Sequence, residues 1–250
     1  MFDWPIWLAA TFWGGITGSS LLIGAFIGFK FNLKARVVAG IMAFGSGVLI
    51  SALSFELMEE AFKRSGFTEV VFGFLLGGII YTMANYALSK AGGKHRKRSG
   101  MKNLNDQQDS SLGIALGALI DGIPESLIIG IGLIEGSSLS MATIIAIFIS
   151  NIPEALSSTA GMKGKGKKAG YIFSIWGGIC LLSAIFAGLG NLLFTGASAS
   201  TLAVIMALAA GGILAMIVDT MIPEAFAETH DFAGLITLLG FLTAFILERI

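Results

Sequence analysis

Residues 119–126 read LIDGIPES and place two carboxylates and a proline inside a run that is otherwise apolar from residue 112 to residue 134. Asp121 and Glu125 are four residues apart, so on a helix their side chains share one face. Ionisable groups in the middle of a hydrophobic span are costly, and such a pair is therefore a functional-site hypothesis. Pro124 has no N–H group, so we expect the carbonyl oxygen of Ile120 to lose its helical partner and to become a further ligand.

The Ile-Pro-Glu triplet of this stretch recurs at residues 152–154 and 222–224, each time inside another apolar run. The chain has 4 prolines, and three of them lie in these triplets. The recurrence predicts an internal repeat. We also expect Pro124, Pro153 and Pro223 to break the helices in which they lie, because proline removes one helical hydrogen bond and crowds the preceding turn.

The composition is that of an integral membrane protein. Of the 250 residues, 55% are hydrophobic and 13% are charged, the mean hydropathy is +0.83, and 34 residues are glycine. Long apolar runs of about 20 residues favour membrane-spanning α-helices over the short alternating strands of an outer-membrane barrel. We therefore predict an all-α protein with one transmembrane domain over residues 1–250 in the cell (inner or plasma) membrane.

Hydropathy and charge together predict eight spans and their orientation. Most of the 16 lysines and arginines lie in the first, third and fifth connections, which places these connections in the cytoplasm and both termini outside. The third connection, residues 91–110, is long and polar and is expected to be a cytoplasmic loop. The predicted spans are residues 5–29, 37–62, 70–89, 112–134, 141–162, 171–194, 199–227 and 232–247.

A second repeat links the second span to the seventh. Without a gap, Ala39 matches Ala203, Gly47 matches Gly211, and residues 59–62 match residues 223–226. Spans five helices apart cross the membrane in opposite directions, so this match predicts an inverted repeat of helices 1–3 against helices 6–8, with helices 4 and 5 between them in a 3+2+3 arrangement. Four Gly-Gly pairs further predict close helix contacts: residues 14–15, 77–78, 177–178 and 211–212.

Helices 4 and 5 carry the candidate site. Asp121 and Glu125 lie in the middle of the fourth span, and Asn151 and Glu154 lie just past the middle of the fifth. With the carbonyl oxygens freed by the two prolines, these side chains make an oxygen-rich site. Three carboxylates without a nearby lysine or arginine require positive charge, which a divalent cation supplies.

Other polar side chains in the spans mark a candidate pathway to and from this site. Glu56 and Glu59 lie near the outer end of the second span, where they form either an entry funnel or ordinary interfacial charge. Ser150 adjoins the fifth-span motif. Asp219 lies deep in the seventh span, and Glu224 follows Pro223 toward its cytoplasmic end. Both are interpreted as an exit route or a transient second ion position.

These residues resemble the ZIP family of divalent-metal transporters. The family's fourth-helix motif, His-Asn-x-Pro-Glu-Gly, is similar to residues 121–126, and its fifth-helix Pro-Glu element is similar to residues 151–155. The resemblance implies eight helices, external termini, a variable loop between helices 3 and 4, and a 3+2+3 inverted repeat. It also implies that Asp121, Glu125, Asn151 and Glu154 bind the metal ion.

The chain departs from the family pattern at its ligands. Asp121 stands where members usually have histidine, Gly122 replaces an asparagine, and the sixth span lacks the glutamate of two-metal members. We therefore expect one site, with an all-oxygen ligand set that favours Mn²⁺, Mg²⁺ or Fe²⁺ while still admitting Zn²⁺, Co²⁺ or Cd²⁺ as substrate. No cofactor is expected. The expected partners are the metal ion and the lipid bilayer, without nucleic acid, and a homodimer is one allowed oligomeric state.

Two other functions fit the same acids. One is a passive cation channel, which differs from a transporter in showing no saturation of flux at low substrate. The other is an intramembrane hydrolase that uses Asp121 with Glu125 or Asp219. The chain contains no His-Glu-x-x-His stretch and no Gly-x-Ser-x-Gly stretch, so we expect that it is not an enzyme.

Overall fold

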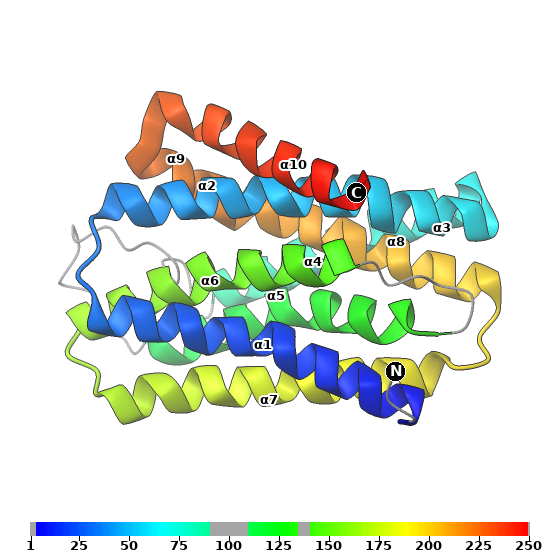
Figure 1. Ribbon diagram of the computed structural model, residues 1–250, viewed down its shortest axis with the longest axis horizontal. Coiled ribbons are helices and arrows are strands. Elements are labelled where there is room, and N and C mark those ends of the chain that lie inside the picture. The colour runs from blue at the N-terminus through cyan, green and yellow to red at the C-terminus, as the bar shows by residue number, and fades with distance from the viewer. Residues whose placement is uncertain (1–3, 91–109, 135–140, 250) are drawn as a thin grey trace.

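The computed structural model describes residues 4–90, 110–134 and 141–249, and these form helices and short turns with no β-strand among them (Figure 1). The predicted loop at residues 91–110 lies outside the described residues except for Ser110, which begins α5. The α-helices are α1 (Ile6–Lys30), α2 (Ala35–Ala52), α3 (Met58–Ser65), α4 (Phe67–Leu88), α5 (Ser110–Gly132), α6 (Met141–Gly164), α7 (Ala169–Phe194), α8 (Ala199–Met216), α9 (Ile222–Thr229) and α10 (Ala233–Arg249).

Six helical stretches among the described residues are long and apolar enough to cross a membrane. They are Ile6–Lys30, Ala35–Ser65, Phe67–Leu88, Thr143–Gly164, Ala169–Phe194 and Ala199–Arg249. The last stretch contains a sharp turn at His230, where φ is 47°, and α10 then runs back along α2 (Figure 1). The protein is thus an all-helical, multi-pass membrane protein.

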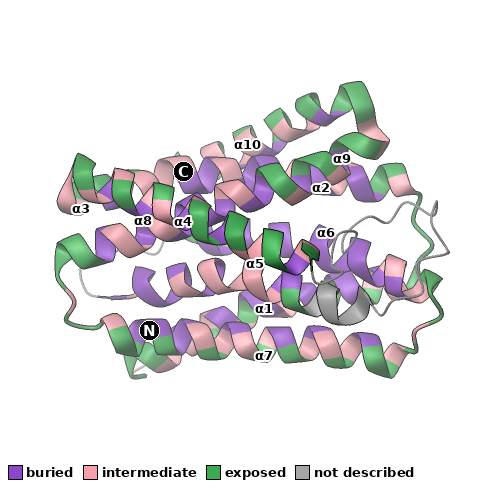
Figure 2. Ribbon diagram, turned by 180° about the vertical axis from the view of Figure 1, so that it is seen from behind, coloured by how far each residue is buried: buried purple, intermediate pink, exposed green. Residues whose placement is uncertain are grey.

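The surface and the interior reverse the polarity of a soluble protein. Large apolar side chains are exposed along α1, α4, α7 and α10, and Figure 2 shows exposed residues recurring along α4, α7 and α10. Several polar and acidic side chains are instead buried. An apolar outer surface is what a bilayer solvates, because lipid tails are as apolar as leucine. Exposed members of this surface include Phe26, Leu75, Ile79, Leu189, Leu193, Leu238 and Leu242.

The helices form two packed groups. In one group α1 packs on α6 and α7, and α5 packs on α7. In the other group α4 packs on α8, and α10 packs on α2. Contacts of α6 with α2 and of α5 with α8 join the groups, so α5 and α6, which carry the Ile-Pro-Glu motifs, lie at the boundary.

The second and seventh predicted spans share an uncommon local structure. The π-helical turn η1 (Leu53–Leu57) connects α2 to α3, and the π-helical turn η3 (Ile217–Met221) connects α8 to α9. The offset that matches Ala39 with Ala203 also matches the first residue of η1 with the first residue of η3. Isolated π-helical turns are rare. Their occurrence at matched positions shows that the sequence repeat is also a repeat of backbone structure.

Two glycines, one on each helix, bring α2 and α10 into close contact where they cross. A Cβ atom on Gly47 would overlap the carbonyl oxygen of Thr237, and one on Gly240 would overlap the carbonyl oxygen of Phe44. Glycine is required at both positions because the two backbones touch there. Such small residues allow the close helix packing that stabilises proteins in membranes.

The crossing of α4 and α8 repeats this arrangement. A Cβ atom on Gly211 would overlap the carbonyl oxygen of Phe74, and one on Gly77 would overlap that of Leu208. These four residues are the sequence counterparts of the four that close the α2–α10 crossing. The Gly-Gly predictions for residues 14–15, 77–78 and 211–212 are confirmed. The prediction for Gly177 and Gly178 is wrong, because no atom of the described residues lies within 4 Å of a Cβ atom on either glycine.

The prolines do not end their helices. Pro124 lies inside α5 and Pro153 lies inside α6, and both helices continue through them. Pro223 lies in the first turn of α9, directly after η3. The prediction that these prolines break their helices is therefore wrong. Each proline removes one backbone hydrogen bond locally, and the rest of the helix and its packing maintain the helical path.

We predict that Gly211→Ala lowers the free energy of unfolding by about 1–3 kcal/mol, because the added methyl group overlaps backbone atoms of α4. Gly177→Ala is the matched control, since its methyl group would enter open space on α7. Thermal unfolding of both variants in detergent checks the prediction. Equal melting of Gly211→Ala and the wild type would contradict the close packing of α8 on α4.

Candidate functional site

All four predicted ligands are buried. The exposed fraction is 2% for Asp121 and 3% for Glu125 on α5, and 7% for Asn151 and 6% for Glu154 on α6. Carboxylates are almost never this buried unless they are paired, hydrogen-bonded or bound to a metal. Their burial within helices of a membrane protein marks the region as the candidate functional site.

The two motif prolines locate this region at the boundary between the helix groups. Pro124 lies against Gly212 of α8, and Pro153 lies against Gly45 of α2. The glycines leave room for the proline rings at both places. The turns that carry Glu125 and Glu154 therefore meet the opposite group on two different helices.

A hydrogen bond from α4 reaches the first acid of the motif. The Tyr81 hydroxyl donates to Oδ1 of Asp121 at 2.8 Å, and both side chains are buried. Hydrogen bonds to charged groups contribute about 1.5–3 kcal/mol, roughly twice as much as neutral ones. The bond joins α5 to the group that contains α4, so it crosses the boundary.

Three further hydrogen bonds fix polar side chains of α6. Nδ2 of Asn151 donates to the carbonyl oxygen of Thr17 on α1 at 3.4 Å. The Ser157 hydroxyl donates to Oε1 of Glu224 on α9, which is a second bond across the boundary. The Ser150 hydroxyl donates to the carbonyl oxygen of Ile147 within its own helix. α6 thus presents a buried polar stripe, which consists of Ser150, Asn151, Glu154, Ser157 and Ser158.

The described residues hold no group of three histidine, cysteine, aspartate or glutamate side chains that could bind a metal ion together. The structure therefore buries the predicted ligands of α5 and α6 without gathering their three acids into one cluster. The two helices contact each other over only a short stretch. An ion held by all four predicted ligands would have to draw the polar faces of α5 and α6 together.

The predicted pathway residues lie in different surroundings. Glu59 is exposed and forms an ion pair with Lys63 at 2.7 Å, which is typical of interfacial charge. Glu56 is half-buried in η1. Glu224 accepts the hydrogen bond from Ser157.

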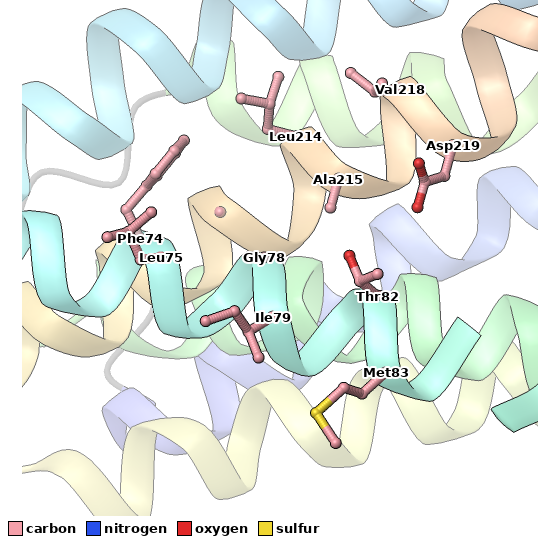
Figure 3. Close-up of a pocket in the computed structure, with 11 residues that line it drawn as sticks. Phe74, Leu75, Gly78, Ile79, Thr82, Met83, Leu214, Ala215, Val218 and Asp219 are labelled. Atoms are coloured by element: carbon pink, nitrogen blue, oxygen red, sulfur yellow. The ribbon is translucent and has the colours of Figure 1, made fainter. Parts of the chain in front are cut away.

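Asp219 lies in an open groove between α4 and α8. The groove has a volume of about 510 Å³ and is mostly apolar. In it the carboxylate of Asp219 points toward the Thr82 hydroxyl (Figure 3). Small residues leave this space open, and the groove is lined by Phe74, Leu75, Gly78, Ile79, Thr82, Met83, Gly211, Leu214, Ala215, Val218 and Asp219.

Sequence reasoning missed two side chains of this site. Ser157 could have been found, because it is three residues after Glu154 and so shares its face of the helix. Tyr81 carried only a weak signal, because a tyrosine in an apolar span is also common at a membrane interface. Its role depends on the pairing of α4 with α5, which no local pattern predicts.

No protein-family model matches the chain, and no curated protein has a sequence similar to it. The resemblance to ZIP transporters therefore stays a prediction that rests on the motifs and their arrangement.

We predict that Ser157→Ala lowers the free energy of unfolding by about 1–3 kcal/mol, because the buried bond to the Glu224 carboxylate loses its donor. Thermal unfolding in detergent checks the result. Ser174→Ala is the control, since this hydroxyl bonds to a carbonyl oxygen of its own helix at an exposed position. A Ser157→Ala protein as stable as the control would show that the bond across the boundary contributes nothing.

Proposed function

We propose that this protein transports divalent metal cations across the membrane through a site formed by α5 and α6. The observation that carries the proposal is the burial of three carboxylates and one amide side chain at the boundary between two helix groups. No lysine or arginine occurs in α5, and the only one in α6, Lys163, lies in its last turn. Charges in such a setting need a cationic partner, and a passing metal ion provides one.

The architecture that we propose is eight spans in a 3+2+3 inverted repeat. The matched π-helical turns and the matched glycine contacts support it. They show that α8 packs on α4 in the same way as α2 packs on α10. α5 and α6 then occupy the centre. Inverted repeats of this kind place the substrate between the halves and expose it to either side of the membrane in turn, which favours alternating access over a fixed pore.

The ligand chemistry favours hard ions. Asp121, Glu125 and Glu154 offer carboxylate oxygens, and Asn151 offers an amide oxygen. Such oxygen ligands suit Mn²⁺ or Fe²⁺ better than a site with imidazole does, whereas imidazole would favour Zn²⁺. In the proposed cycle the ion draws Glu154 of α6 toward the two acids of α5, so that one site forms from both helices.

The proposed orientation follows from charge. Lysines and arginines concentrate where α1 joins α2 and where α6 joins α7. By the positive-inside rule these ends face the cytoplasm and both termini face outside. This layout and the Ile-Pro-Glu motifs are the features that the chain shares with ZIP transporters, and they support membership of that family as part of the proposal.

We predict that Glu125→Gln and Glu154→Gln each reduce Mn²⁺ uptake into proteoliposomes by more than about 100-fold. Each change removes a charged direct ligand, and even indirect partners of metal sites typically contribute about 10–100-fold. The isosteric amide keeps the size of the side chain. Glu69→Gln, in the first turn of α4, is the control and should transport like the wild type. Normal uptake by either site variant would refute the site.

A further inference from the structure

Tyr81 contacts the candidate site, but the proposed function assigns no role to it. Its side chain is 3% exposed, and its hydroxyl donates to Oδ1 of Asp121. A carboxylate has about four lone-pair positions on two oxygens, so it can accept this bond and bind a cation at the same time. The bond fixes the rotation of the Asp121 carboxylate relative to α5.

The internal repeat provides a built-in comparison. The offset that matches Gly77 with Gly240 places Ala244 of α10 at the position of Tyr81. The offset that matches Pro124 with Pro153 places Ser150 at the position of Asp121. The counterpart of the tyrosine–aspartate pair is therefore an alanine–serine pair.

This counterpart packs without any tyrosine. Ala244 is buried in an apolar cluster with Val48, Ala52 and Ala146. The Ser150 hydroxyl bonds within its own helix instead of to α10. The same helix crossing is thus built once with alanine and once with tyrosine, so the fold does not itself require a tyrosine. Tyr81 occurs in the half in which its partner is an acid.

We infer that Tyr81 is a positioning residue of the cation site, which holds the Asp121 carboxylate in the orientation that binds the metal ion. The inference rests on the proposed function. Its physical basis is that hydrogen bonds to a ligating carboxylate orient the ligand before the ion arrives, so that less ordering remains to be done on binding. A phenol suits this role because it donates a hydrogen bond without adding a charge.

The groove beside α4 is a separate feature. Thr82 and Gly78 line the groove that contains Asp219, but Tyr81 does not (Figure 3). A change at Tyr81 that keeps the ring therefore leaves the groove lining intact. Tyr81→Phe removes only the hydroxyl that donates to Asp121.

The experiment measures Mn²⁺ binding to the purified full-length protein by the loss of the free-ion EPR signal, together with Mn²⁺ uptake kinetics in proteoliposomes. Tyr81→Phe should weaken binding by about 10–100-fold and raise KM by a similar factor, with kcat changed by less than about twofold. Tyr86→Phe, an exposed tyrosine farther along α4, is the matched control and should bind like the wild type. Thermal unfolding and gel filtration verify that each variant is folded.

A double-mutant cycle separates positioning from a general structural effect. In an Asp121→Ala background, Tyr81→Phe should cause no further loss of Mn²⁺ affinity, because the group that Tyr81 orients is gone. Equal affinity of Tyr81→Phe and the wild type, or an undiminished loss in the Asp121→Ala background, would overturn the role of Tyr81 alone. A wild-type protein that binds no Mn²⁺ would instead overturn the proposed site, and the role of Tyr81 with it.

Discussion

The burial of Asp121, Glu125 and Glu154 is the constraint on which the rest of the structure depends. A charged side chain inside a membrane protein costs several kcal/mol unless hydrogen bonds, counter-charges or water compensate for it. At Asp121, the Tyr81 hydroxyl of the neighbouring α4 provides one such hydrogen bond. Such partners can reach the acids only because the helices pack closely, and that packing depends on glycines where backbones touch. Site and packing are thus two parts of one arrangement.

Comparison of the two halves of the internal repeat shows which features they share and where they differ. Both halves keep the π-helical turn and the glycine crossings, so these are the common framework. The halves differ beside the candidate site. Asp219 stands where the other half has Phe55, and Thr82 stands where it has Phe245. Phe55 and Phe245 pack with ring centroids 5.1 Å apart, which fills the space that is an open groove around Asp219. Polar groups replace packed rings on only one side of the protein.

Much of this could be predicted from the sequence, because the decisive signals are local. Long apolar runs predict helices, and the match of Ala39 with Ala203 predicts the repeated packing. The acids that the sequence places in the middle of apolar spans are buried on α5 and α6. What the sequence could not supply depends on tertiary contacts: Tyr81 bonds to a residue 40 positions away, and the prolines are accommodated because Gly45 and Gly212 leave room for their rings. At Gly177 and Gly178 the sequence predicted a helix contact that the described part of the structure lacks, because a pair of small residues makes a contact only if another helix lies opposite.

The measurement that tests the central claim most directly is uptake of Mn²⁺ and Zn²⁺, separately, into proteoliposomes that contain either the wild type or Asp121→His. If Asp121 binds the transported ion, the wild type accumulates Mn²⁺ with saturation kinetics, and the histidine variant shifts its preference toward Zn²⁺, because imidazole suits zinc better than a carboxylate does. If neither protein accumulates either ion, the buried acids of α5 and α6 do not form a metal-transport site, and the proposed function is wrong.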